Sequence, residues 1–473
     1  MLTNHPVLSG RKRAWSVEVS AYRRMGVIKK ILINIIFIFA CGTGYAATTL
    51  YVWTNSPNPG TPYNAWTNAA RTIQTAVDAT SDGDTVLVTN GTYDTGGTVG
   101  VYYATTYIST NRVMVPQYKS LTIRSVNGPD VTIIKGAPDA GTGGCGPAAV
   151  RCVFLAWNNV CLSGFTLTNG YTGTSGDNYH DRSGGGIDLH GFSEVVSNCV
   201  ISGNKADYRG GGVIFYYAGI LTNCTLTANS CAGDGGGATF AWGGTMSDCM
   251  LNCNTSSGYG GGVCFYNGGG TMNNCTLSNN VAVAGGGAYF LYQTSTMNKC
   301  LLVNNRATAT TGGGGVYMNQ PGTDGLLNNC LLIGNTSPGA GQVVFAGGGR
   351  LNNCTLVAGS SGARMNVSGA MTNCILWGNT NYDVSIVTTG IVSYTCSREV
   401  TPGEGNIGVD PQFVNTNTAN YRLNANSPCV NTGTNQGWMT NSVDFDGRMR
   451  IRYGRVDMGA YECLYSGTIY SVW

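Results

Sequence analysis

The chain has 473 residues, of which 71 are glycine and 18 are cysteine, and only 10% are charged. It carries 26 Lys and Arg against 23 Asp and Glu, a net charge of +3, but seven basic residues and one acidic residue lie in the first 46. The remaining 19 basic and 22 acidic residues leave a slight negative balance, which argues against nucleic acid as a partner. The length would fit two or three ordinary domains, whereas a continuous internal repeat favours one elongated domain.

The first 46 residues read as an export signal. Basic residues lead into the apolar run Ile31 to Ala40, and Gly44-Tyr45-Ala46 is a small-x-small cleavage site. The apolar run is too short for a membrane-spanning helix. The residues before Met25 resemble an upstream extension, so Met25 is an alternative start. We therefore expect a secreted protein, with outer-membrane association as the alternative, and no transmembrane segment in the mature chain.

From Gly184 to Asn379 one short pattern repeats. A cysteine followed by two mostly apolar residues recurs at Cys199, Cys224, Cys249, Cys275, Cys300, Cys330, Cys354 and Cys374. A glycine triplet keeps step with it and ends at Gly186, Gly212, Gly237, Gly262, Gly287 and Gly315. The first five of these cysteines are 25 or 26 residues apart. A fixed period in this range predicts a solenoid.

Each repeat is built from strands rather than helices. After each triplet apolar residues alternate with others, as in Val213 and Phe215, and Cys275 alternates with Leu277 in the same way. Two or three short strands per turn predict a parallel β-solenoid whose coils stack about 4.8 Å apart, so that like residues form columns. Residues 69–79 carry apolar residues at helical spacing, and this short helix is expected to cover the open end of the stack.

Two asparagine columns and the cysteines fit this arrangement. We expect the asparagines before the cysteines to form left-handed corners, and those five residues after the cysteines to hydrogen-bond from coil to coil. We expect the column cysteines to be free, buried thiols, because parallel neighbours are poorly oriented for disulfides. If disulfides form, we expect their partners off the column, at Cys145, Cys152, Cys161, Cys231, Cys253, Cys429 and Cys463. The disulfide state stays open.

Three parts of the chain resemble known families. The run Asp82-Gly83-Asp84-Thr85-Val86, between a short helix and Gly91-Thr92-Tyr93, resembles the entry of bacterial secreted right-handed β-helix proteins. The glycine repeat with Leu-x-x-Asn, as in Leu226 to Asn229, resembles polymorphic outer-membrane protein repeats. The tail resembles the terminal module of choice-of-anchor Q proteins, in the segments Asp410-Pro411-Gln412-Phe413-Val414, Asp444-Phe445-Asp446-Gly447-Arg448 and Val456-Asp457-Met458-Gly459-Ala460-Tyr461-Glu462.

These resemblances imply an all-β, right-handed parallel β-helix of the pectin lyase-like kind, with a short N-terminal capping helix. The expected organisation is a signal in residues 1–46, the β-helix with its N-terminal cap in 48–400, and a C-terminal cap module in 401–473. Because only 11 residues follow Glu462, we expect neither an autotransporter barrel nor a membrane-anchored sorting tail, and this favours simple secretion.

One charged cluster is a candidate catalytic site. His180 and His190 stand beside four charged residues, Asp177, Asp181, Arg182 and Asp188. Counting back from successive triplets gives Asp181 and Asp207, whose carboxylates we expect to stack beside Arg209. With the histidines, these residues would suit a polysaccharide lyase, with a base and a neutralising cation, or a glycoside hydrolase with paired carboxylates. The alternative is a salt-bridged surface loop at an insertion.

Two further sets of side chains are candidate binding sites. An outward aromatic strip would stack on sugar rings or simply suit exposed strands, and its candidate carbohydrate-binding residues are Tyr216, Trp242, Tyr266, Tyr289 and Tyr292. Four carboxylates in the tail resemble oxygen ligands for Ca²⁺, the alternative being a module held by arginine ion pairs; they are Asp444, Asp446, Asp457 and Glu462.

The favoured function is that of an exported, non-catalytic adhesin-like scaffold that binds a polysaccharide or a cell-surface glycan. The alternatives are a secreted polysaccharide lyase or glycoside hydrolase acting on acidic polysaccharide, and a purely structural repeat protein. Apart from the possible Ca²⁺, no cofactor is expected, and we expect a monomer.

Overall fold

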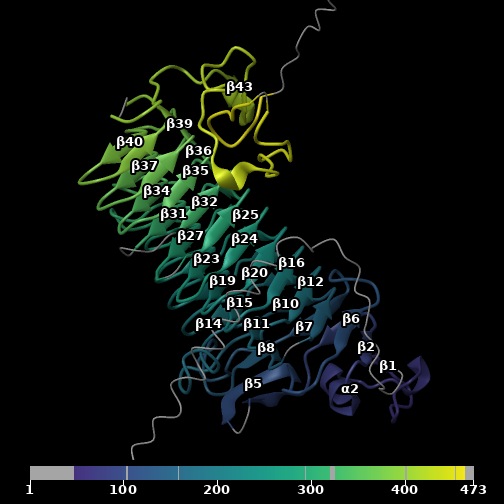
Figure 1. Ribbon diagram of the computed structural model, residues 1–473. Coiled ribbons are helices and arrows are strands. Elements are labelled where there is room, and N and C mark those ends of the chain that lie inside the picture. Colours follow the sequence, from purple (N-terminus) through teal and green to yellow (C-terminus); the bar gives the residue numbers. More distant parts are fainter. Residues whose placement is uncertain are drawn as a thin grey trace, which may run out of the picture. The chain divides into compact units, whose positions relative to one another are not determined.

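The computed structural model describes residues 47–463, apart from 103–104, 158, 293, 320–324, 400–401 and 453. The expected export signal lies outside these residues. The described chain forms an all-β, right-handed parallel β-helix, in which short strands from successive coils stack as rungs (Figure 1). No described helix is long and apolar enough to cross a membrane.

Three long sheets, named A, B and C, run along the described β-helix. Sheet A has 13 parallel strands: β1 (Thr49–Val52), β2 (Thr85–Val88), β6 (Thr122–Ser125), β9 (Cys161–Ser163), β12 (Val195–Ser197), β16 (Ile220–Thr222), β20 (Thr245–Ser247), β24 (Thr271–Asn273), β28 (Thr296–Asn298), β32 (Leu326–Asn328), β35 (Arg350–Asn352), β38 (Ala370–Thr372) and β41 (Ile391–Ser393). Sheet B has 12: β3 (Gly91–Tyr93), β7 (Thr132–Lys135), β10 (Thr166–Thr168), β13 (Val200–Ser202), β17 (Thr225–Thr227), β21 (Met250–Asn252), β25 (Thr276–Ser278), β29 (Leu301–Val303), β33 (Leu331–Ile333), β36 (Thr355–Val357), β39 (Ile375–Trp377) and β42 (Cys396–Ser397).

Sheet C also has 12 strands: β4 (Thr98–Tyr102), β5 (Thr105–Val115), β8 (Val150–Leu155), β11 (Ile187–Leu189), β15 (Val213–Phe215), β19 (Ala238–Phe240), β23 (Val263–Phe265), β27 (Ala288–Phe290), β31 (Val316–Met318), β34 (Val343–Phe345), β37 (Ala363–Met365) and β40 (Val384–Ile386). Its first pair, β4 and β5, is antiparallel. A fourth sheet, D, runs along the middle coils with five two-residue strands: β14 (Lys205–Ala206), β18 (Ser230–Cys231), β22 (Thr255–Ser256), β26 (Val281–Ala282) and β30 (Arg306–Ala307).

In the regular coils the chain passes through sheets C, A, B and D in turn, and the middle residue of each A and B strand points inward. One coil contributes Phe215 from β15, Leu221 from β16 and Leu226 from β17, all fully buried. Because Phe215 pairs in register with Phe240, like side chains stack: the ring centroids of these two lie 4.4 Å apart. The predicted core columns are confirmed. Stacking is required because no single coil can bury its apolar side alone.

The cysteine column is buried as predicted, in the corner between sheets A and B, from Cys199 to Cys374. All 17 cysteines of the described residues are free, so the structure shows none of the disulfides expected off the column. The residue before each column cysteine has a positive φ, for example 52° at Asn198 and 53° at Asn274. Asparagine tolerates this left-handed conformation better than most residues do, which explains its recurrence at the corner.

The second asparagine column forms the predicted ladder inside the β-helix. Asn229 donates from Nδ2 to Oδ1 of Asn254 over 3.0 Å, and Asn254 donates in the same way to Asn280 over 3.0 Å. Each side chain also donates to a backbone carbonyl of the preceding coil, as Asn254 does to Leu226 over 2.9 Å. Since these asparagines are fully buried, the ladder satisfies polar groups that water cannot reach.

The glycine triplets follow from close approach of neighbouring coils. A Cβ atom on Gly236 would lie 2.5 Å from the carbonyl oxygen of Thr255 and 2.6 Å from that of Gly261. Both contacts are to backbone, which cannot move aside as a side chain can. Glycine therefore lets the triplet pass beside sheet D of the next coil.

The described helices are α2 (Ile73–Ala79) and three short 3₁₀ helices, η2 (Trp66–Asn68), η3 (Thr416–Thr418) and η4 (Gly437–Met439). The predicted capping helix is present as α2, which begins four residues later than expected. The side chain of Thr72 caps α2 by accepting a hydrogen bond from the backbone of Thr75. Ile73, Ala76 and Val77 are buried against the first coils.

Beyond β42, residues 402–463 form a C-terminal module around a hairpin of β43 (Phe413–Asn415) and β44 (Asn420–Leu423), drawn in yellow in Figure 1. The module packs against the outer face of sheet B in the last coils. There Leu331 and Val357 are buried together with Tyr421 and Tyr461 of the module. Outward positions of sheet B, mostly polar earlier in the chain, become mostly apolar under this cover, and the polar Thr355 accepts a hydrogen bond from the backbone of Ala460.

Candidate functional site

The most unusual part of the β-helix is an insertion of residues 173–183, between β10 and β11. It folds over the outer face of sheet C and is held there by Asp181, whose carboxylate accepts hydrogen bonds from the backbone of Ile108 (2.7 Å), Ser109 (2.9 Å) and Asp177 (2.8 Å). Because Asp181 is buried and its oxygens are occupied by backbone amides, its role in this structure is to fasten the insertion to β5.

Arg151 fastens the insertion from the other side. Its fully buried guanidinium donates to the carbonyl oxygens of Gly184 (2.8 Å), Ser183 (2.7 Å) and His180, and to Oδ1 of Asn111 (2.9 Å). Burial lowers the pKa of Arg151, and the nearby carboxylates partly oppose that shift. The backbone of His180 is therefore anchored to β8.

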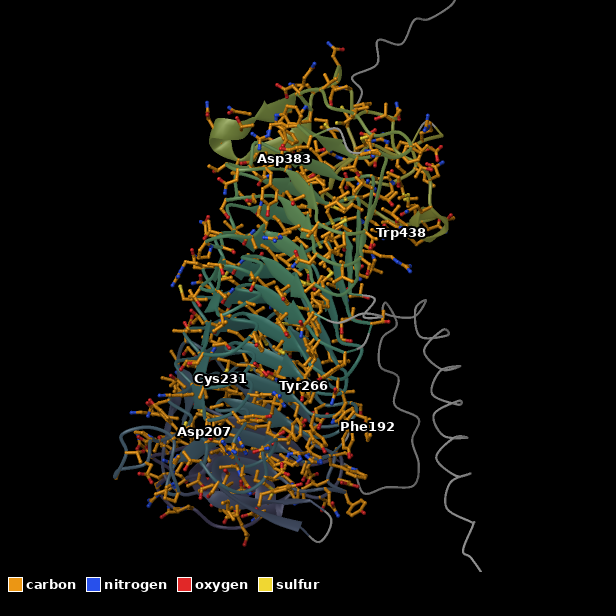
Figure 2. The ribbon with its side chains drawn as sticks, turned by 90° about the vertical axis from the view of Figure 1, so that its left-hand side faces the viewer. Phe192, Asp207, Cys231, Tyr266, Asp383 and Trp438 are labelled. Atoms are coloured by element: carbon orange, nitrogen blue, oxygen red, sulfur yellow. The ribbon has the colours of Figure 1, made fainter. Side chains whose placement is uncertain are left out.

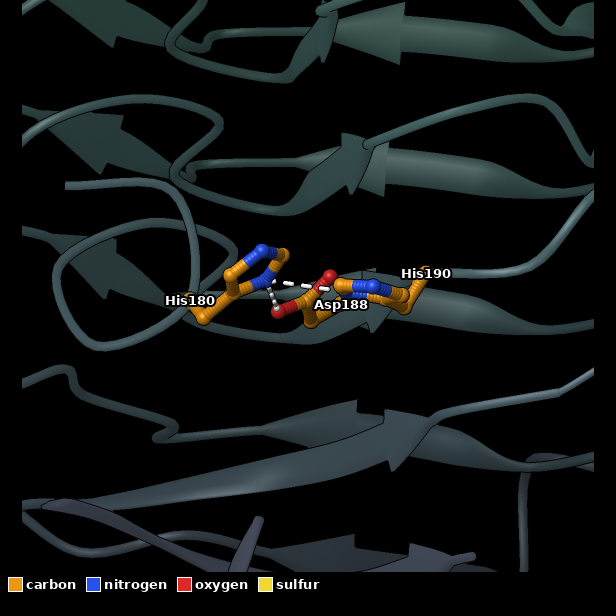
Figure 3. A group of neighbouring side chains, drawn as sticks. All are labelled: His180, Asp188 and His190. Carbon is orange, nitrogen blue, oxygen red and sulfur yellow. Dashed lines mark hydrogen bonds and ion pairs between the residues drawn. The ribbon is translucent and has the colours of Figure 1, made fainter. Parts of the chain in front are cut away.

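Under the insertion lies a cluster of three buried side chains, His180, Asp188 and His190 (Figure 3). Nδ1 of His180 lies 3.2 Å from Oδ2 of Asp188 and 3.1 Å from Nδ1 of His190. In the described part of the chain, this is the one group of three His, Cys, Asp or Glu side chains whose ligand atoms all lie within 4.8 Å of one another. The two histidines that were predicted to share a site lie together in the structure. Their partner is Asp188, which the sequence analysis named only as a neighbouring charged residue.

Aromatic rings enclose this cluster. Tyr216 stacks on His190 with ring centroids 4.7 Å apart, and Tyr107 lies 4.5 Å from the ring of His180. Burial, with a further contribution from His180, lowers the pKa of His190 to about 2, so its imidazole is neutral. Neutral imidazole offers a lone pair, as a metal ligand or a hydrogen-bond acceptor.

Asp188 owes its burial to its place in the fold. It occupies the outward position of β11 and pairs in register with Ile214, which is followed along sheet C by Thr239, Cys264 and Tyr289. Asp188 is the charged member of this run of five, and the insertion covers it. A carboxylate at such a position costs free energy unless it is paired or bound to a cation.

Glu194 is a second buried carboxyl group near the cluster. Oε1 accepts a hydrogen bond from the backbone of Gly191, while Oε2 has no hydrogen-bond partner among the described residues. Burial raises the pKa of Glu194 to about 8, and the backbone hydrogen bonds only partly oppose this shift. Glu194 is therefore mostly protonated near neutral pH.

Asp181 and Asp207, which were predicted to stack, bind different partners. Asp207 forms an ion pair with Arg182, at 2.7 Å, and its backbone nitrogen donates to Oγ1 of Thr172. The count from the glycine triplets holds as far as Arg182, whose carbonyl oxygen accepts a hydrogen bond from the backbone of Tyr208. The two side chains nevertheless differ, because the carboxylate of Asp181 turns to the backbone of β5 and that of Asp207 turns to Arg182.

Arg209 is also engaged elsewhere. It pairs with Asp234 at 3.2 Å, and its guanidinium lies 3.6 Å from the ring centroid of Tyr266. The five predicted catalytic residues therefore do not form one acid–base site. The alternative prediction, a salt-bridged surface loop at an insertion, matches the ion pair of Asp207 with Arg182, whereas Arg209 is buried and pairs with Asp234 outside the insertion.

A row of aromatic side chains follows the turn between sheets C and A. We call it the aromatic ridge and define it as Phe192, Tyr217, Trp242, Tyr266 and Tyr292. Trp242 is 47% exposed, and Phe192 and Tyr292 are each 46% exposed. Phe192 stacks on Tyr217 with centroids 4.6 Å apart, and Tyr266 lies 5.7 Å from Tyr292. In the view of Figure 2, Phe192 lies on the right-hand side of the β-helix and Asp207 lies towards the left.

Two predicted sugar-binding residues lie beside this ridge rather than in it, Tyr216 against Tyr217 and Tyr289 in the cluster on which Tyr266 packs. Tyr289 is only 2% exposed, because it is stacked between Tyr259 and Tyr317 at centroid distances of 4.5 and 5.5 Å. It cannot offer a face to a ligand, so that prediction is wrong. Tyr216 is partly exposed and packs on the histidines. Phe192, which the sequence reasoning missed, lies 25 residues before Tyr217, and this repeat distance was the available signal.

The four carboxylates proposed for Ca²⁺ do not form a group of converging ligands in the structure. Asp446 pairs with Arg422 at 2.6 Å and with Arg448 at 3.3 Å, and Glu462 pairs with Arg450 at 3.2 Å. The carboxylate of Asp444 accepts hydrogen bonds from the backbone of Arg448 and Glu462. The carboxylate of Asp457 accepts hydrogen bonds from the backbone of Asn431 and Cys463. The geometry matches the alternative, in which arginine ion pairs hold the module.

Comparisons with known proteins found similar folds among solved structures. No family model matches the chain, and no curated protein sequence matches it. Among solved structures, pectate lyase Pel9A is 14% identical with a TM-score of 0.47, over 89% of this chain and 97% of the lyase. XylC in complex with xylose is 8% identical with a TM-score of 0.49, over 78% of this chain and 87% of XylC. No functional residue is transferred from either.

Proposed function

We propose that this chain is an exported, non-catalytic β-helix protein that binds polysaccharide along the aromatic ridge. The observation that carries the proposal is the exposure of Phe192, Trp242 and Tyr292 at the same turn of every second coil, with Tyr217 and Tyr266 on the coils between them. Exposed aromatic faces in a row stack on the apolar faces of sugar rings. Single exposed apolar residues are ordinary, whereas a continuous row of large ones marks an interaction surface.

The spacing of the ridge suits an extended polymer. Coils repeat about every 4.8 Å along the axis, a distance comparable with the length of one sugar unit. Tyr217, Trp242 and Tyr292 occupy equivalent places two residues after Phe215, Phe240 and Phe290. Since the strands fix these turns, the ridge is organised before a ligand arrives, which lowers the entropic cost of binding.

A surface or secreted location is the second part of the proposal. It is supported by the basic and apolar leader of residues 1–46 and by the resemblance to polymorphic outer-membrane protein repeats and to the choice-of-anchor Q module. We also propose that the protein is a monomer. Fractionation of producing cells tests the location, and light scattering of the purified protein tests the monomer.

The experiment for binding uses the full chain on neutral and acidic polysaccharides, by affinity electrophoresis and calorimetry. Trp242→Ala and Phe192→Ala are each expected to weaken binding about tenfold, equivalent to about 1.4 kcal/mol. The matched control is Trp377→Ala, which removes a partly exposed tryptophan from a hollow under the C-terminal module.

Three results would count against the proposal. If no polysaccharide binds, the result favours the alternative that the protein is a purely structural repeat protein. If Trp377→Ala weakens binding and Trp242→Ala does not, the ligand lies under the C-terminal module. If wild-type protein releases unsaturated uronic acid products or new reducing ends from acidic polysaccharide, the protein is a lyase or hydrolase, and the non-catalytic assignment fails.

A further inference from the structure

We infer that His180, Asp188 and His190 bind one divalent transition-metal ion of the zinc type, which locks the insertion onto sheet C. The separations between donor atoms are the first argument. Nδ1 of His180 lies 3.1 Å from Nδ1 of His190 and 3.2 Å from Oδ2 of Asp188. Two ligands that each lie about 2.1 Å from a metal ion stand roughly this far apart.

The second argument comes from counting protons. A neutral imidazole has one N–H and one lone pair. If Nδ1 of His180 carries the imidazole proton, this single N–H has to donate to both Oδ2 of Asp188 and Nδ1 of His190. If Nδ1 of His190 carries it, the lone pair of His180 faces the carboxylate oxygen of Asp188. A metal ion between the three atoms satisfies all the lone pairs at once.

The third argument is the isolation of Asp188. Its side chain is fully buried and, among the described residues, forms no ion pair with lysine or arginine. Its Oδ1 has no hydrogen-bond partner among those residues either. Arg151 lies close enough for its charge to interact with Asp188, but it makes no hydrogen bond to that carboxylate, because its donors are directed to backbone carbonyls and Asn111. Buried carboxylates are paired or coordinate metals.

The donor set selects the kind of metal. Two imidazoles and one carboxylate suit Zn²⁺, Co²⁺ and similar ions, whereas Ca²⁺ and Mg²⁺ prefer oxygen ligands. His180 comes from the insertion, while Asp188 and His190 belong to β11 and the residue after it. One ion would thus bridge the insertion and the sheet. Enclosure by Tyr107, Phe154 and Tyr216 points to a structural site.

The test uses the full chain without a histidine tag. The protein is stripped with a chelator, then loaded with Zn²⁺ or Co²⁺ both in the folded state and during refolding, because the site is enclosed. We expect one metal ion per chain by elemental analysis. We also expect visible Co²⁺ bands of nitrogen and oxygen coordination, without the intense near-ultraviolet band that thiolate ligands give. This spectrum separates the site from binding by the many cysteines.

Asp188→Asn and His190→Gln are expected to weaken Co²⁺ binding at least tenfold. Asp207→Asn is the matched control, because it removes a nearby carboxylate whose partner is Arg182, and it should bind as the wild type does. Substoichiometric uptake by the wild type after both loading routes, a thiolate spectrum, or equal binding by Asp188→Asn would overturn the inference. If the variants do not fold, the wild-type stoichiometry and spectrum still decide it.

Discussion

Replacing Asn254 by alanine tests the internal ladder that joins the coils. Its Oδ1 accepts hydrogen bonds from the backbone nitrogen and from Nδ2 of Asn229, each over 3.0 Å. Its Nδ2 donates to the carbonyl oxygen of Leu226 over 2.9 Å and to Oδ1 of Asn280 over 3.0 Å. All four bonds lie in the interior, where Asn229, Asn254 and Asn280 are fully buried.

The expected cost follows from the groups that lose their partners. Asn254→Ala leaves the backbone N–H and one amide proton of Asn229 without acceptors, and each buried, unsatisfied donor costs about 1–3 kcal/mol. Asn280 keeps a partner, because its Oδ1 also accepts from the backbone of Asn254 over 2.9 Å. We therefore expect the two orphaned donors to lower the local free energy of unfolding by about 2–6 kcal/mol.

The control is Asn252→Ala in the same coil. Asn252 faces outward and accepts hydrogen bonds from Ser278 and Asn279, which water can replace, so its loss should cost less than about 1 kcal/mol. Because solenoids unfold in segments, the measurement is native-state hydrogen exchange of residues 225–235 together with the urea midpoint. The ladder would be refuted as a stabilising element if Asn254→Ala exchanged no faster than Asn252→Ala.

Three further predictions concern other parts of the β-helix. Folding raises the pKa of Glu194 from 4.5 to about 8, so its contribution to stability is full below pH 4.5 and is lost as the pH rises towards 8, by at most about 5 kcal/mol. In a chelating buffer, Glu194→Gln should therefore make the melting temperature depend less on pH over that range. A variant whose melting temperature changes with pH as the wild type's does would contradict this. Gly236→Ala should lower the melting temperature or prevent folding, since its Cβ would lie 2.5 Å from a backbone oxygen, whereas Gly144→Ala, with nothing within 4 Å, should fold normally. Among the described cysteines, Cys253 is exposed, so brief alkylation of the native protein followed by peptide mapping should label it well before Cys224 or Cys275; equal labelling would show that the column is accessible.

The repeat period of the sequence predicted the fold because, in a stack of coils, residues one period apart occupy equivalent places in successive coils. The cysteine period placed Cys199 to Cys374 in one buried column, and the asparagines five residues later in one ladder. Each depends on contacts between a residue and its counterpart one coil away, and these contacts are the same in every regular coil. The capping helix was predictable for a different reason, since the spacing of Ile73, Ala76 and Val77 within one helix is a local pattern.

The side chains of the charged cluster could not be oriented by the same count. Residues 173–183 add chain between β10 and β11, and where such a loop folds depends on contacts with distant segments, here Ile108 and Ser109. Those contacts direct Asp181 to the backbone of β5 and leave Asp207 with Arg182. They also bury Asp188 at an outward strand position, which its sequence neighbours do not reveal.

What the sequence determined by itself was the periodic part of this protein: parallel strands, inward columns, left-handed corners and the asparagine ladder. The tertiary structure alone decided which charged and aromatic side chains meet, how His180 reaches Asp188 and His190, and why Tyr289 is covered while Trp242 is not. The physical reason is that a repeat carries the same information in every coil, whereas an insertion or a terminal module is positioned by contacts that occur once.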